Sequence, residues 1–360
     1  MKKPDKSPYH LAFLARRKRS LLKKRSRRKS KIKTERRALE GKTYNEQKEL
    51  KKWKRHKQVT APRDFTFLEN TEGTTKFINN LEVNIKRNKP VFVNLERVEK
   101  MDYGAVTVLL SVMNIFKENH INFDGNFPKK IELRNKIIDS QFFDHLSKII
   151  PRGVGNPIKK DNKIFGKGEK KVESALGLEL MQEASKTIWG EKRMCKGFQR
   201  VLLELMQNTH NHAGLKKMGE ECWWITVNHD PENKIVSFGF VDYGQGIFES
   251  LNKKPVGNRW AGYYEKIKDR LINGTNAEIL EKLLEGELHR TVTMQSFRGK
   301  GLPGIKEVLK RNQISNLHII SNDVFSDVEK NEYRTLSVGF KGTFIYWELR
   351  SYNENKIWNL

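Results

Sequence analysis

The sequence predicts an α/β protein in which two domains, each a sheet covered by helices, follow a basic N-terminal arm. After residue 62, segments with helical periodicity alternate with short runs rich in β-branched and aromatic residues. Residues 151–172 interrupt this alternation and are rich in Gly, Lys, Pro and Asn, as linkers are. We therefore expect an arm at residues 1–62, a small α/β domain at 63–150, and a larger domain with a mixed sheet at 173–360.

The arm carries most of the positive charge of the chain. Residues 1–60 hold 24 of the 70 Lys and Arg but only 5 of the 43 Asp and Glu, in a chain of formal net charge +27. Helix formers dominate, yet repulsion among like charges opposes helix formation, so we expect the arm to be helical or disordered. The densest run supplies these candidates for phosphate contacts: Arg16, Arg17, Lys18, Arg19, Lys23, Lys24, Arg25, Arg27, Arg28 and Lys29.

Three interpretations of the arm remain open. Nucleic acid would bind with a steep salt dependence and little sequence preference, because each phosphate contact releases counterions. An acidic protein surface or an anionic membrane would use the same charge. The third interpretation is a solvated tail without a partner.

Cysteine usage and hydropathy bear on the compartment. The two cysteines, Cys195 and Cys222, have no metal-ligand spacing, and two cysteines in 360 residues indicate a reducing environment. No apolar run approaches the roughly 18 residues that a transmembrane helix needs. Leu11–Ala15 is too short for the apolar core of a signal peptide. We therefore expect a cytoplasmic protein without a transmembrane segment.

Periodicity and short apolar runs predict five elements in the small domain. Asn88-Lys89-Pro90 separates the first helix from a short run typical of a buried strand. The expected elements are a helix at Thr74–Arg87, a strand at Val91–Leu95, a helix at Gly104–Lys117, a strand at Lys130–Leu133 and a helix at Phe142–Ile149.

Residues 91–110, VFVNLERVEKMDYGAVTVLL, resemble the strand–loop–helix segment of STAS domains, which occur in anti-sigma-factor antagonists and sulfate transporters. In that family the loop usually has the sequence Asp-Ser-Ser-Gly, and its second Ser accepts a phosphoryl group. This chain has Asp102-Tyr103-Gly104-Ala105, so no Ser stands at that position. The resemblance therefore implies a docking or regulatory module for a protein partner rather than a kinase substrate.

The larger domain is expected to begin with two helices and continue with strands. Asp230-Pro231-Glu232-Asn233 has the composition of a turn between two of these strands. The expected elements are helices at Ser174–Trp189 and Lys196–Ala213, strands at Cys222–His229, Lys234–Asp242 and Phe344–Leu349, and a helix that ends at Arg311.

The helix at Lys196–Ala213 carries the first candidate site. Glu204 and Asn208 are four residues apart, so their side chains project from the same side of the helix. A carboxylate and a carboxamide beside the apolar residues of this helix are costly to desolvate without partners. Asn208 offers an oxygen ligand to Mg²⁺, and Glu204 can activate a water or hydroxyl group for attack on phosphorus. A paired polar patch on an ordinary helix is the alternative.

Three glycine motifs lie at the ends of the expected elements: one follows a strand, one precedes a helix and one opens a strand. Asp242-Tyr243-Gly244-Gln245-Gly246-Ile247 stands at the end of a strand, where glycines let the backbone approach a flat ligand. Gly299-Lys300-Gly301-Leu302 precedes a helix, whose free N–H groups attract phosphate. Gly342-Thr343 opens the last strand.

The four elements occur in a fixed order: Glu-x-x-x-Asn on a helix, Asp-x-Gly-x-Gly-Ile after a strand, Gly-x-Gly-Leu before a helix, and Gly-Thr at the start of a strand. This order resembles that of the Bergerat-fold ATPases (GHKL), the family of DNA gyrase, the large heat-shock chaperones, histidine kinases and mismatch-repair proteins. The resemblance spans about Ser174–Arg350. It implies an α/β sandwich that binds ATP with Mg²⁺.

The resemblance also implies a role for each residue at a motif position. Glu204 would be the general base, Asn208 the Mg²⁺ ligand, and Asp242 the acceptor for the adenine amino group. The other implied ATP-binding residues are Gly244, Gly246 and Ile247 near adenine, Gly299, Gly301 and Leu302 near the phosphates, and Thr343 in the adenine-side network. Arg298 and Lys300 are added because their charges would counter those of phosphate.

Within that family, His212 and Ala213 are most similar to the anti-sigma-factor serine kinases. Those kinases pair with separate STAS proteins, so the resemblances of both halves of the chain point to the same subgroup. Two departures stand against this subgroup: the phosphoacceptor Ser is missing, and Phe248–Phe297 is long and mostly helical (Tyr263–Ile272, Ala277–Leu284) where the kinases have a short lid. His210 and His212 are better explained by structural roles than as metal ligands.

Three functions remain open from the sequence. The first is an ATP-binding regulatory or effector protein, in which Mg²⁺-ATP binding with slow hydrolysis orders the lid and controls engagement of a nucleic acid or a protein partner. The second is a serine/threonine protein kinase of the partner-switching type. The third is a non-catalytic, ATP-gated scaffold, as in a toxin or phage-defence system. Many members of the family dimerise, and the sequence leaves open whether this chain forms a homodimer.

Overall fold

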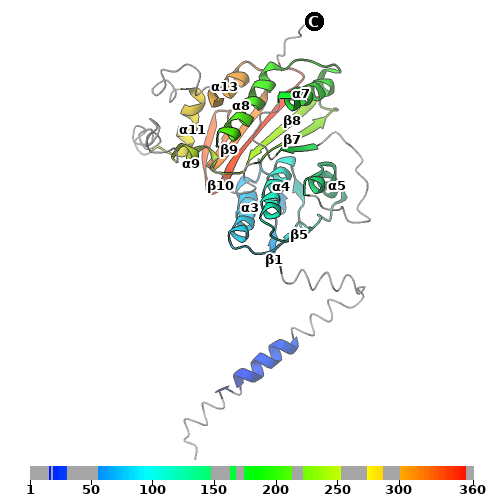
Figure 1. Cartoon of the computed structure of the whole chain (residues 1–360), viewed down its shortest axis with the longest axis vertical. Coiled ribbons are helices and arrows are strands. Elements are labelled where there is room, and N and C mark those ends of the chain that lie inside the picture. Colours follow the sequence, from blue (N-terminus) through cyan, green and yellow to red (C-terminus); the bar gives the residue numbers. More distant parts are fainter. Residues whose placement is uncertain are drawn as a thin grey trace, which may run out of the picture. The chain divides into compact units, whose positions relative to one another are not determined.

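A computed structural model describes residues 16–17, 19–30, 56–146, 163–167, 174–212, 222–252, 274–286 and 301–353 (Figure 1). The side chains of residues 163–167, 174, 210–212 and 250–252 are not described. The chain forms two units, Met1–His56 and Lys57–Leu360. In the first unit residues 19–30 are helical, and every described residue of this helix is exposed.

The small domain is built on a parallel sheet of three strands in the order β1–β3–β5. Buried apolar side chains of the helices α3 and α4 join those of the sheet in one core. A second, two-stranded sheet pairs β2 with β4. The elements are β1 (Lys57–Thr60), β2 (Asp64–Phe65), α3 (Thr71–Lys86), β3 (Val91–Asn94), β4 (Lys100–Met101), α4 (Tyr103–Glu118), β5 (Phe123–Asn126), α5 (Ile131–Asp139) and α6 (Phe142–His145).

The larger domain is built on a five-stranded antiparallel sheet in the order β6–β7–β8–β10–β9. Long helices lie along one face of this sheet (Figure 1). The elements are β6 (Lys163–Lys167), α7 (Ser174–Trp189), α8 (Lys196–His212), β7 (Trp223–Asp230), β8 (Ile235–Asp242), α9 (Gly246–Asn252), α11 (Asn276–Glu285), α13 (Gly301–Lys310), β9 (Ser315–Asp327) and β10 (Glu332–Arg350).

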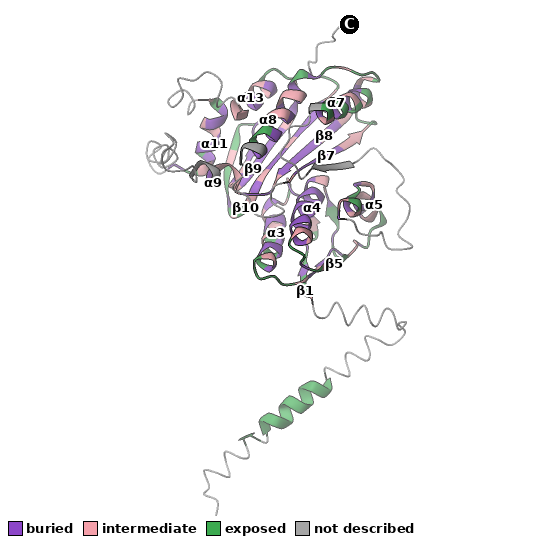
Figure 2. Cartoon of the chain, in the orientation of Figure 1, coloured by how far each residue is buried: buried purple, intermediate pink, exposed green. Residues whose placement is uncertain are grey.

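Alternation along the strands gives the five-stranded sheet two apolar faces. On β10, Ile345, Trp347 and Leu349 share a core with α7, α8, α11 and α13. Phe344, whose side chain lies on the other face of the strand, belongs instead to the core of the small domain, together with Trp224 of β7. Figure 2 shows the resulting buried layers above and below the sheet. The small domain therefore covers the face of the sheet that the larger domain's own helices leave open.

Helix α4 lies at the centre of this arrangement. All thirteen residues from Gly104 to Phe116 are buried, so the helix has no solvent-facing side over that length. A helix that is apolar all round is stable only when it is covered on every side. Two of the polar residues within it are satisfied locally, since Thr107 donates to the carbonyl of Tyr103 (2.7 Å) and Ser111 to that of Val108 (2.7 Å). The third, Asn114, donates its Nδ2 to the sulfur of Cys222 at 3.7 Å. The sequence of α4 thus requires the small domain's sheet on one side and the larger sheet on the other.

The expected α/β fold class is confirmed, because the described chain combines helices with a parallel and an antiparallel sheet. The mixed sheet expected in the larger domain is wrong for the described strands, because all four of their pairings are antiparallel. Among the expected elements, the helix at Ser174–Trp189 has the same bounds as α7, and most of the others differ from the observed bounds by one to three residues. The strand expected at Lys130–Leu133 is wrong: these residues begin α5, and the third strand of the parallel sheet is β5. The reason is periodicity, since Leu133, Ile137 and Ile138 are buried at helical spacing while Ile131 is 67 % exposed.

The structure differs from the expected domain bounds in two places. Residues 57–60, expected in the arm, form β1 of the parallel sheet. Residues 163–167, within the expected linker, form β6, which pairs with the edge of β7. The lid helix expected at Tyr263–Ile272 lies outside the described residues, whereas the one at Ala277–Leu284 corresponds to α11. In the described part of the chain, no helix combines the length and the apolar character that crossing a membrane requires.

Candidate nucleotide site

Helix α8 presents three polar side chains, one per turn, along the side that meets α13. Its apolar residues Val201, Leu202, Leu205 and Met206 are at most 4 % exposed. Because the helix repeats every 3.6 residues, burial of these positions leaves Arg200, Glu204 and Asn208 in a separate row. Glu204 is half-buried and Asn208 is exposed, so both remain reachable from solvent.

The start of α13 lies against the two residues of the Glu-x-x-x-Asn motif. A Cβ atom on Gly301 would be 3.3 Å from Oε2 of Glu204 and 3.3 Å from Nδ2 of Asn208. The absence of a side chain at Gly301 therefore keeps space open between the helix N-terminus and the carboxylate. The first turn of a helix carries N–H groups without intrahelical partners, together with a partial positive charge. A phosphate group between α13 and α8 would meet both.

Asp242, at the end of β8, is joined to α8 by a side-chain hydrogen bond. The hydroxyl of Thr209 donates to Oδ2 of Asp242 at 3.1 Å, and Thr209 directly follows Asn208 on the helix. Across the sheet, Asp242 is paired with Thr343 of β10. The end of α8 thus brings the predicted metal ligand and the predicted adenine acceptor to the same region of the molecule.

Gly342 allows the chain to pass close to the glycine turn after β8. Its φ of +130° is a conformation that L residues rarely adopt, and a Cβ atom there would lie 2.5 Å from the carbonyl oxygen of Asp242. Such a contact is impossible without a shift of the backbone. A glycine is therefore required next to Thr343, which explains the Gly-Thr pair at this point of β10.

Two residues that the sequence analysis did not select, Ser321 and Asn322 on β9, hold the glycine turn in place. The hydroxyl of Ser321 lies 2.9 Å from the N–H of Ile247, which donates to it, and 3.0 Å from Oγ1 of Thr343. The Asn322 side chain donates to the carbonyl of Gln245 at 2.8 Å and accepts from the N–H of Phe248 at 3.1 Å. The sequence feature that could have identified these two residues is the Ser-Asn pair directly after the apolar run Ile319-Ile320.

Arg200 is a third residue that the sequence analysis did not select. Its guanidinium lies against α13, since a Cβ atom on Gly304 would be 2.8 Å from a terminal nitrogen of Arg200. Arg200 stands one turn before Glu204, so it adds a fixed positive charge to the row that ends at Asn208. Positive charge beside a helix N-terminus favours a phosphate ligand, because a guanidinium forms charge-assisted hydrogen bonds with its oxygens.

The other predicted residues divide between the two motifs and the undescribed part of the chain. Gly244 is buried, and Gly246 with a φ of +74° opens α9 together with Ile247. Leu302 follows Gly301 in α13 and is half-buried. Arg298, Gly299 and Lys300 lie outside the described residues, as do Lys18 in the arm and the side chains of His210 and His212.

The described residues fit a Mg²⁺-nucleotide better than a protein-bound metal alone. In the described ranges, no group of three or more His, Cys, Asp or Glu could hold a metal ion. Mg²⁺ commonly binds through one or two protein oxygens plus substrate phosphates and keeps several waters. Asn208 can supply one such oxygen beside the space at Gly301. The residues therefore suit a metal that arrives with a phosphate ligand.

The loop that resembles the STAS phosphoacceptor loop lies on the opposite face of the sheet. Asp102 caps α4, since it accepts from the N–H of Ala105 at 2.6 Å and from that of Phe67 at 2.7 Å. A Cβ atom on Gly104 would be 2.9 Å from the ring of Phe344. Phe344 faces the small domain, whereas Asp242 faces α8. The loop therefore lies on the face of the sheet opposite α8, with Gly104 and Ala105 buried and Asp102 and Tyr103 half-buried.

Replacing Asp102 by Ala is expected to lower the free energy of unfolding by about 2–4 kcal/mol, because it removes a helix cap and leaves the Phe67 N–H unpaired. Burial also raises the pKa of Asp102 above its usual value, although its N–H donors and Lys136 act in the opposite direction. Because folding raises this pKa, the protonated carboxyl favours the folded state. That contribution to the free energy of unfolding is fully present below the unfolded pKa and is lost as pH rises through the folded pKa. Urea unfolding from pH 3 to 7 measures both effects, with exposed Asp144→Ala as control.

No family model matches the chain, and comparisons with curated proteins and with solved structures found no match either.

Proposed function

We propose that the larger domain binds ATP with Mg²⁺ between α8, the turn after β8 and the start of α13. The observation that carries the proposal is the convergence of three motifs that are far apart in sequence. Gly301 lies against Glu204 and Asn208, and Asp242 is bonded to the next residue of the same helix, Thr209. The resemblance to the GHKL ATPases assigns these same residues to phosphate, metal and adenine.

The two ends of the site suit the two ends of a nucleotide. At the phosphate end, Arg200 and the N–H groups of α13 supply positive charge, and Glu204 supplies a base. At the base end, the Asp242 carboxylate accepts hydrogen bonds and is held by Thr209 at 3.1 Å. Bound Mg²⁺ would neutralise charge on the phosphates, with Asn208 as its protein ligand.

Replacing Asp242 by Asn tests the adenine end. The change keeps the size of the side chain but removes the charge and one acceptor atom, which reduces affinity by about 1.5–3 kcal/mol, or roughly 10- to 150-fold. Isothermal titration of the full chain with Mg²⁺-ATP measures this loss. Asp230→Asn is the matched control, because Asp230 is a half-buried residue at the end of β7 that pairs with Ile235 at the far end of β8. A wild-type chain that does not bind adenine nucleotides would refute the proposal.

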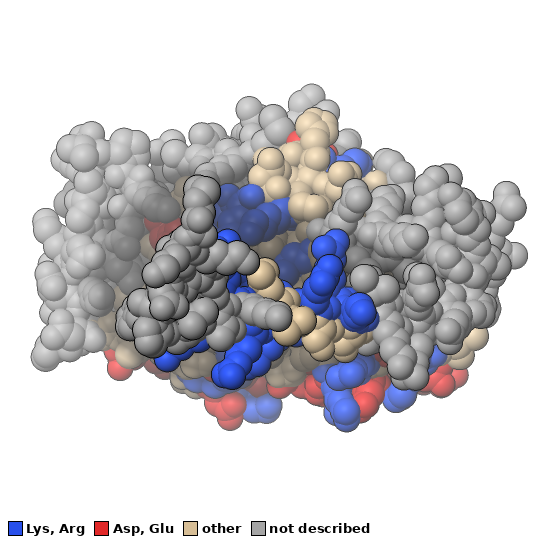
Figure 3. Space-filling model, turned by 90° about the horizontal axis from the view of Figure 1, so that it is seen from below, with Lys and Arg blue, Asp and Glu red and all other residues tan. Residues whose placement is uncertain are grey.

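We infer that nucleotide binding controls engagement of a nucleic acid through the basic arm. Residues 16–30 contain ten Lys and Arg and no Asp or Glu. The described side chains of these residues are all exposed. On the face of the whole chain shown in Figure 3, the blue Lys and Arg atoms are more prominent than the red acidic ones. In an α-helix consecutive residues are 100° apart, so these charges surround the axis instead of forming one stripe. Such a helix suits a groove with phosphates on both sides better than a flat anionic surface.

Replacing Lys23, Lys24, Arg25, Arg27 and Arg28 by Gln tests the arm. Each lost phosphate contact removes about 0.9 from the slope of log K against log salt concentration, so we expect a slope shallower by about 4–5. Fluorescence anisotropy with duplex DNA and duplex RNA, from 50 to 300 mM salt, measures it. The control carries five Lys→Gln changes at exposed sites of the second unit: Lys86, Lys89, Lys100, Lys129 and Lys130. Equal slopes for both variants would refute the assignment.

The position of the small domain favours regulation over phosphotransfer. Thr343 and Phe344 are neighbours on β10, one on the side of the predicted nucleotide site and the other in the core of the small domain. Occupancy of the site can therefore influence the small domain through a single strand. The partner-switching kinase would instead transfer the γ-phosphoryl group to a second protein, and the scaffold would bind ATP without turnover. Labelled ATP distinguishes these outcomes from slow hydrolysis.

A further inference from the structure

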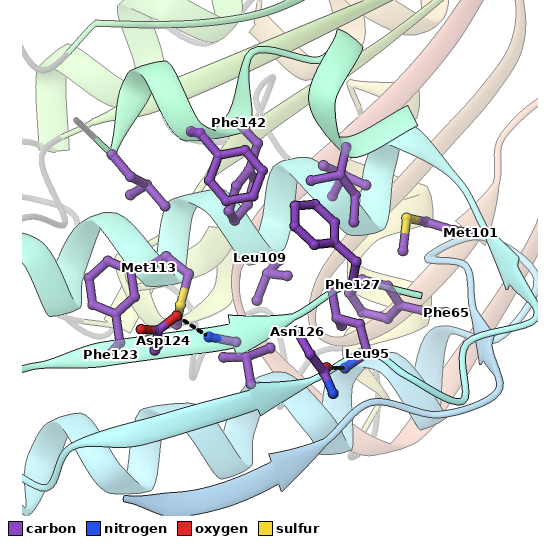
Figure 4. Close-up of a pocket in the computed structure, with 16 residues that line it drawn as sticks. Phe65, Leu95, Met101, Leu109, Met113, Phe123, Asp124, Asn126, Phe127 and Phe142 are labelled. Carbon is purple, nitrogen blue, oxygen red and sulfur yellow. Dashed lines mark hydrogen bonds between the residues drawn. The ribbon is translucent and has the colours of Figure 1, made fainter. Parts of the chain in front are cut away.

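The small domain contains a cavity of about 120 Å³ that no part of the proposed function uses. It lies between the parallel sheet, helix α4 and the segment from α5 to α6 (Figure 4). Thirteen of its sixteen lining residues have apolar side chains. Protein interiors are packed to the density of organic crystals, so a void of this size within a core is uncommon.

Aromatic rings dominate the lining. Phe65, Phe123, Phe127, Phe142 and Phe143 all line the cavity, and Figure 4 shows the labelled rings arranged around it, with Met113 of α4 between them. Phe127 and Phe143 pack against each other at a centroid distance of 5.5 Å. Aromatic rings prefer edge-to-face or offset contacts with further rings, and a methionine sulfur also contacts rings favourably.

The cavity is open on one side. Phe123, Phe127 and Phe143 are only half-buried, whereas Phe65 is completely buried. Half-buried phenyl groups that line an apolar cavity lose water contact when a ligand enters, which is favourable in proportion to the apolar area covered. The opening gives a small molecule access without unfolding of the domain.

The polar edge of the cavity is already satisfied. Oδ1 of Asn126 accepts from the N–H of Leu95 at 2.7 Å, and its Nδ2 donates to Asn94 at 2.9 Å. Oδ1 of Asp124 accepts from the N–H of Gly125 at 2.8 Å. These groups do not require a polar ligand, and the Asp124 carboxylate would repel an anionic one. The lining therefore favours a neutral, apolar molecule over a fatty acid.

We propose that this cavity binds a neutral, single-ring aromatic molecule. The volume supports that class, since an engineered apolar cavity of about 150 Å³ in another protein stays dry and binds benzene. Helix α4 forms one wall through Leu109 and Met113 and also packs, through Gly104, against Phe344 of the larger sheet. A ligand in the cavity thus contacts the helix that joins the two domains.

Titration of the full chain, labelled with ¹³C at its methionine methyl groups, tests the proposal with benzyl alcohol as the probe. We expect saturable shifts of the Met101 and Met113 resonances, which belong to cavity residues, and none at Met181 or Met206, which lie in the other core. Benzoate, with the same ring but a negative charge, should bind more than about tenfold more weakly. No saturable shift at Met101 and Met113 would overturn the proposal.

A cavity-filling variant provides the second test. Leu109→Phe places a ring in the cavity and should abolish the saturable shifts, while Ile131→Phe, at a position 67 % exposed on α5, should leave them unchanged. If Leu109→Phe does not fold, Val106→Ile adds a single methylene group to the same wall and should weaken binding. Unchanged binding in a folded Leu109→Phe protein would show that the probe binds elsewhere and would overturn the proposal.

Discussion

The Glu204→Ala variant is expected to hydrolyse ATP about 10²- to 10⁴-fold more slowly than the wild type, because general-base catalysis typically contributes a factor of that size. Affinity for ATP should change little, since Glu204 is predicted to act on the attacking water and Asp242 to bind adenine. Steady-state turnover and isothermal titration on the same preparation separate the two effects. The expected pattern is a loss in kcat with an almost unchanged dissociation constant.

Glu183→Ala is the matched control, because Glu183 is an exposed glutamate on the neighbouring helix α7. It should leave both quantities unchanged. Glu204→Gln adds a second comparison, as it keeps the size of the side chain and removes only its basicity. If Glu204→Ala and the wild type turn over ATP at the same rate, Glu204 is not the base. Measurable binding without any wild-type turnover would instead support the scaffold.

The parts of the candidate site that were predictable depend on local sequence. The row of Glu204 and Asn208 follows from helical spacing over a few residues, and the glycine turns follow from residue type alone. Ser321 and Asn322 were not predictable in this way, because their partners Ile247 and Gln245 are about 75 residues distant in sequence. The pairing of β10 with both β8 and β9 brings these segments together.

The errors in the fold have related causes. The window at Lys130–Leu133 was too short to distinguish two periodicities, and the helical one appears only when Ile137 and Ile138 are included. Strand β5, with the sequence Phe-Asp-Gly-Asn, has little β-propensity and owes its conformation to pairing with β3. Strand β10 extends over Glu332–Arg350, well beyond the apolar run at its end, because its long hairpin with β9 supplies backbone partners.

The packing of the small domain on the larger sheet was not predicted at all. Its clearest sequence feature is α4, in which all thirteen residues from Gly104 to Phe116 are buried and only Thr107, Ser111 and Asn114 are polar. A helix at the surface of an isolated domain would instead carry a polar stripe. Contacts at the edge of this interface are polar, as where Ser337 donates its N–H to Glu72 at 2.9 Å and Lys341 pairs with Glu82 at 3.4 Å. The core of the small domain is therefore shared with one face of the larger sheet, while the other face has a core of its own.

Replacing Phe344 by Ala is expected to lower the free energy of unfolding by about 3–5 kcal/mol, because the side chain is completely buried at the centre of this shared core. Its ring packs edge-on against that of Phe67 at a centroid distance of 4.9 Å. It also lies over Gly104, where a Cβ atom would come within 2.9 Å. Loss of the ring leaves a void between the larger sheet and the small domain, and Gly104 has no side chain to fill it. Urea unfolding followed by tryptophan fluorescence measures the effect.

Tyr352→Ala is the control, since this aromatic residue near the end of the same strand is 58 % exposed and should change stability by less than about 0.5 kcal/mol. The wild type should unfold in a single transition if the domains depend on a common core, whereas Phe344→Ala should separate the two halves into distinct transitions. An effect no larger than that of Tyr352→Ala would mean that the small domain is not held on the sheet by this contact. Phe344 would then be unable to transmit occupancy of the nucleotide site, because coupling between sites requires an element that both of them bias.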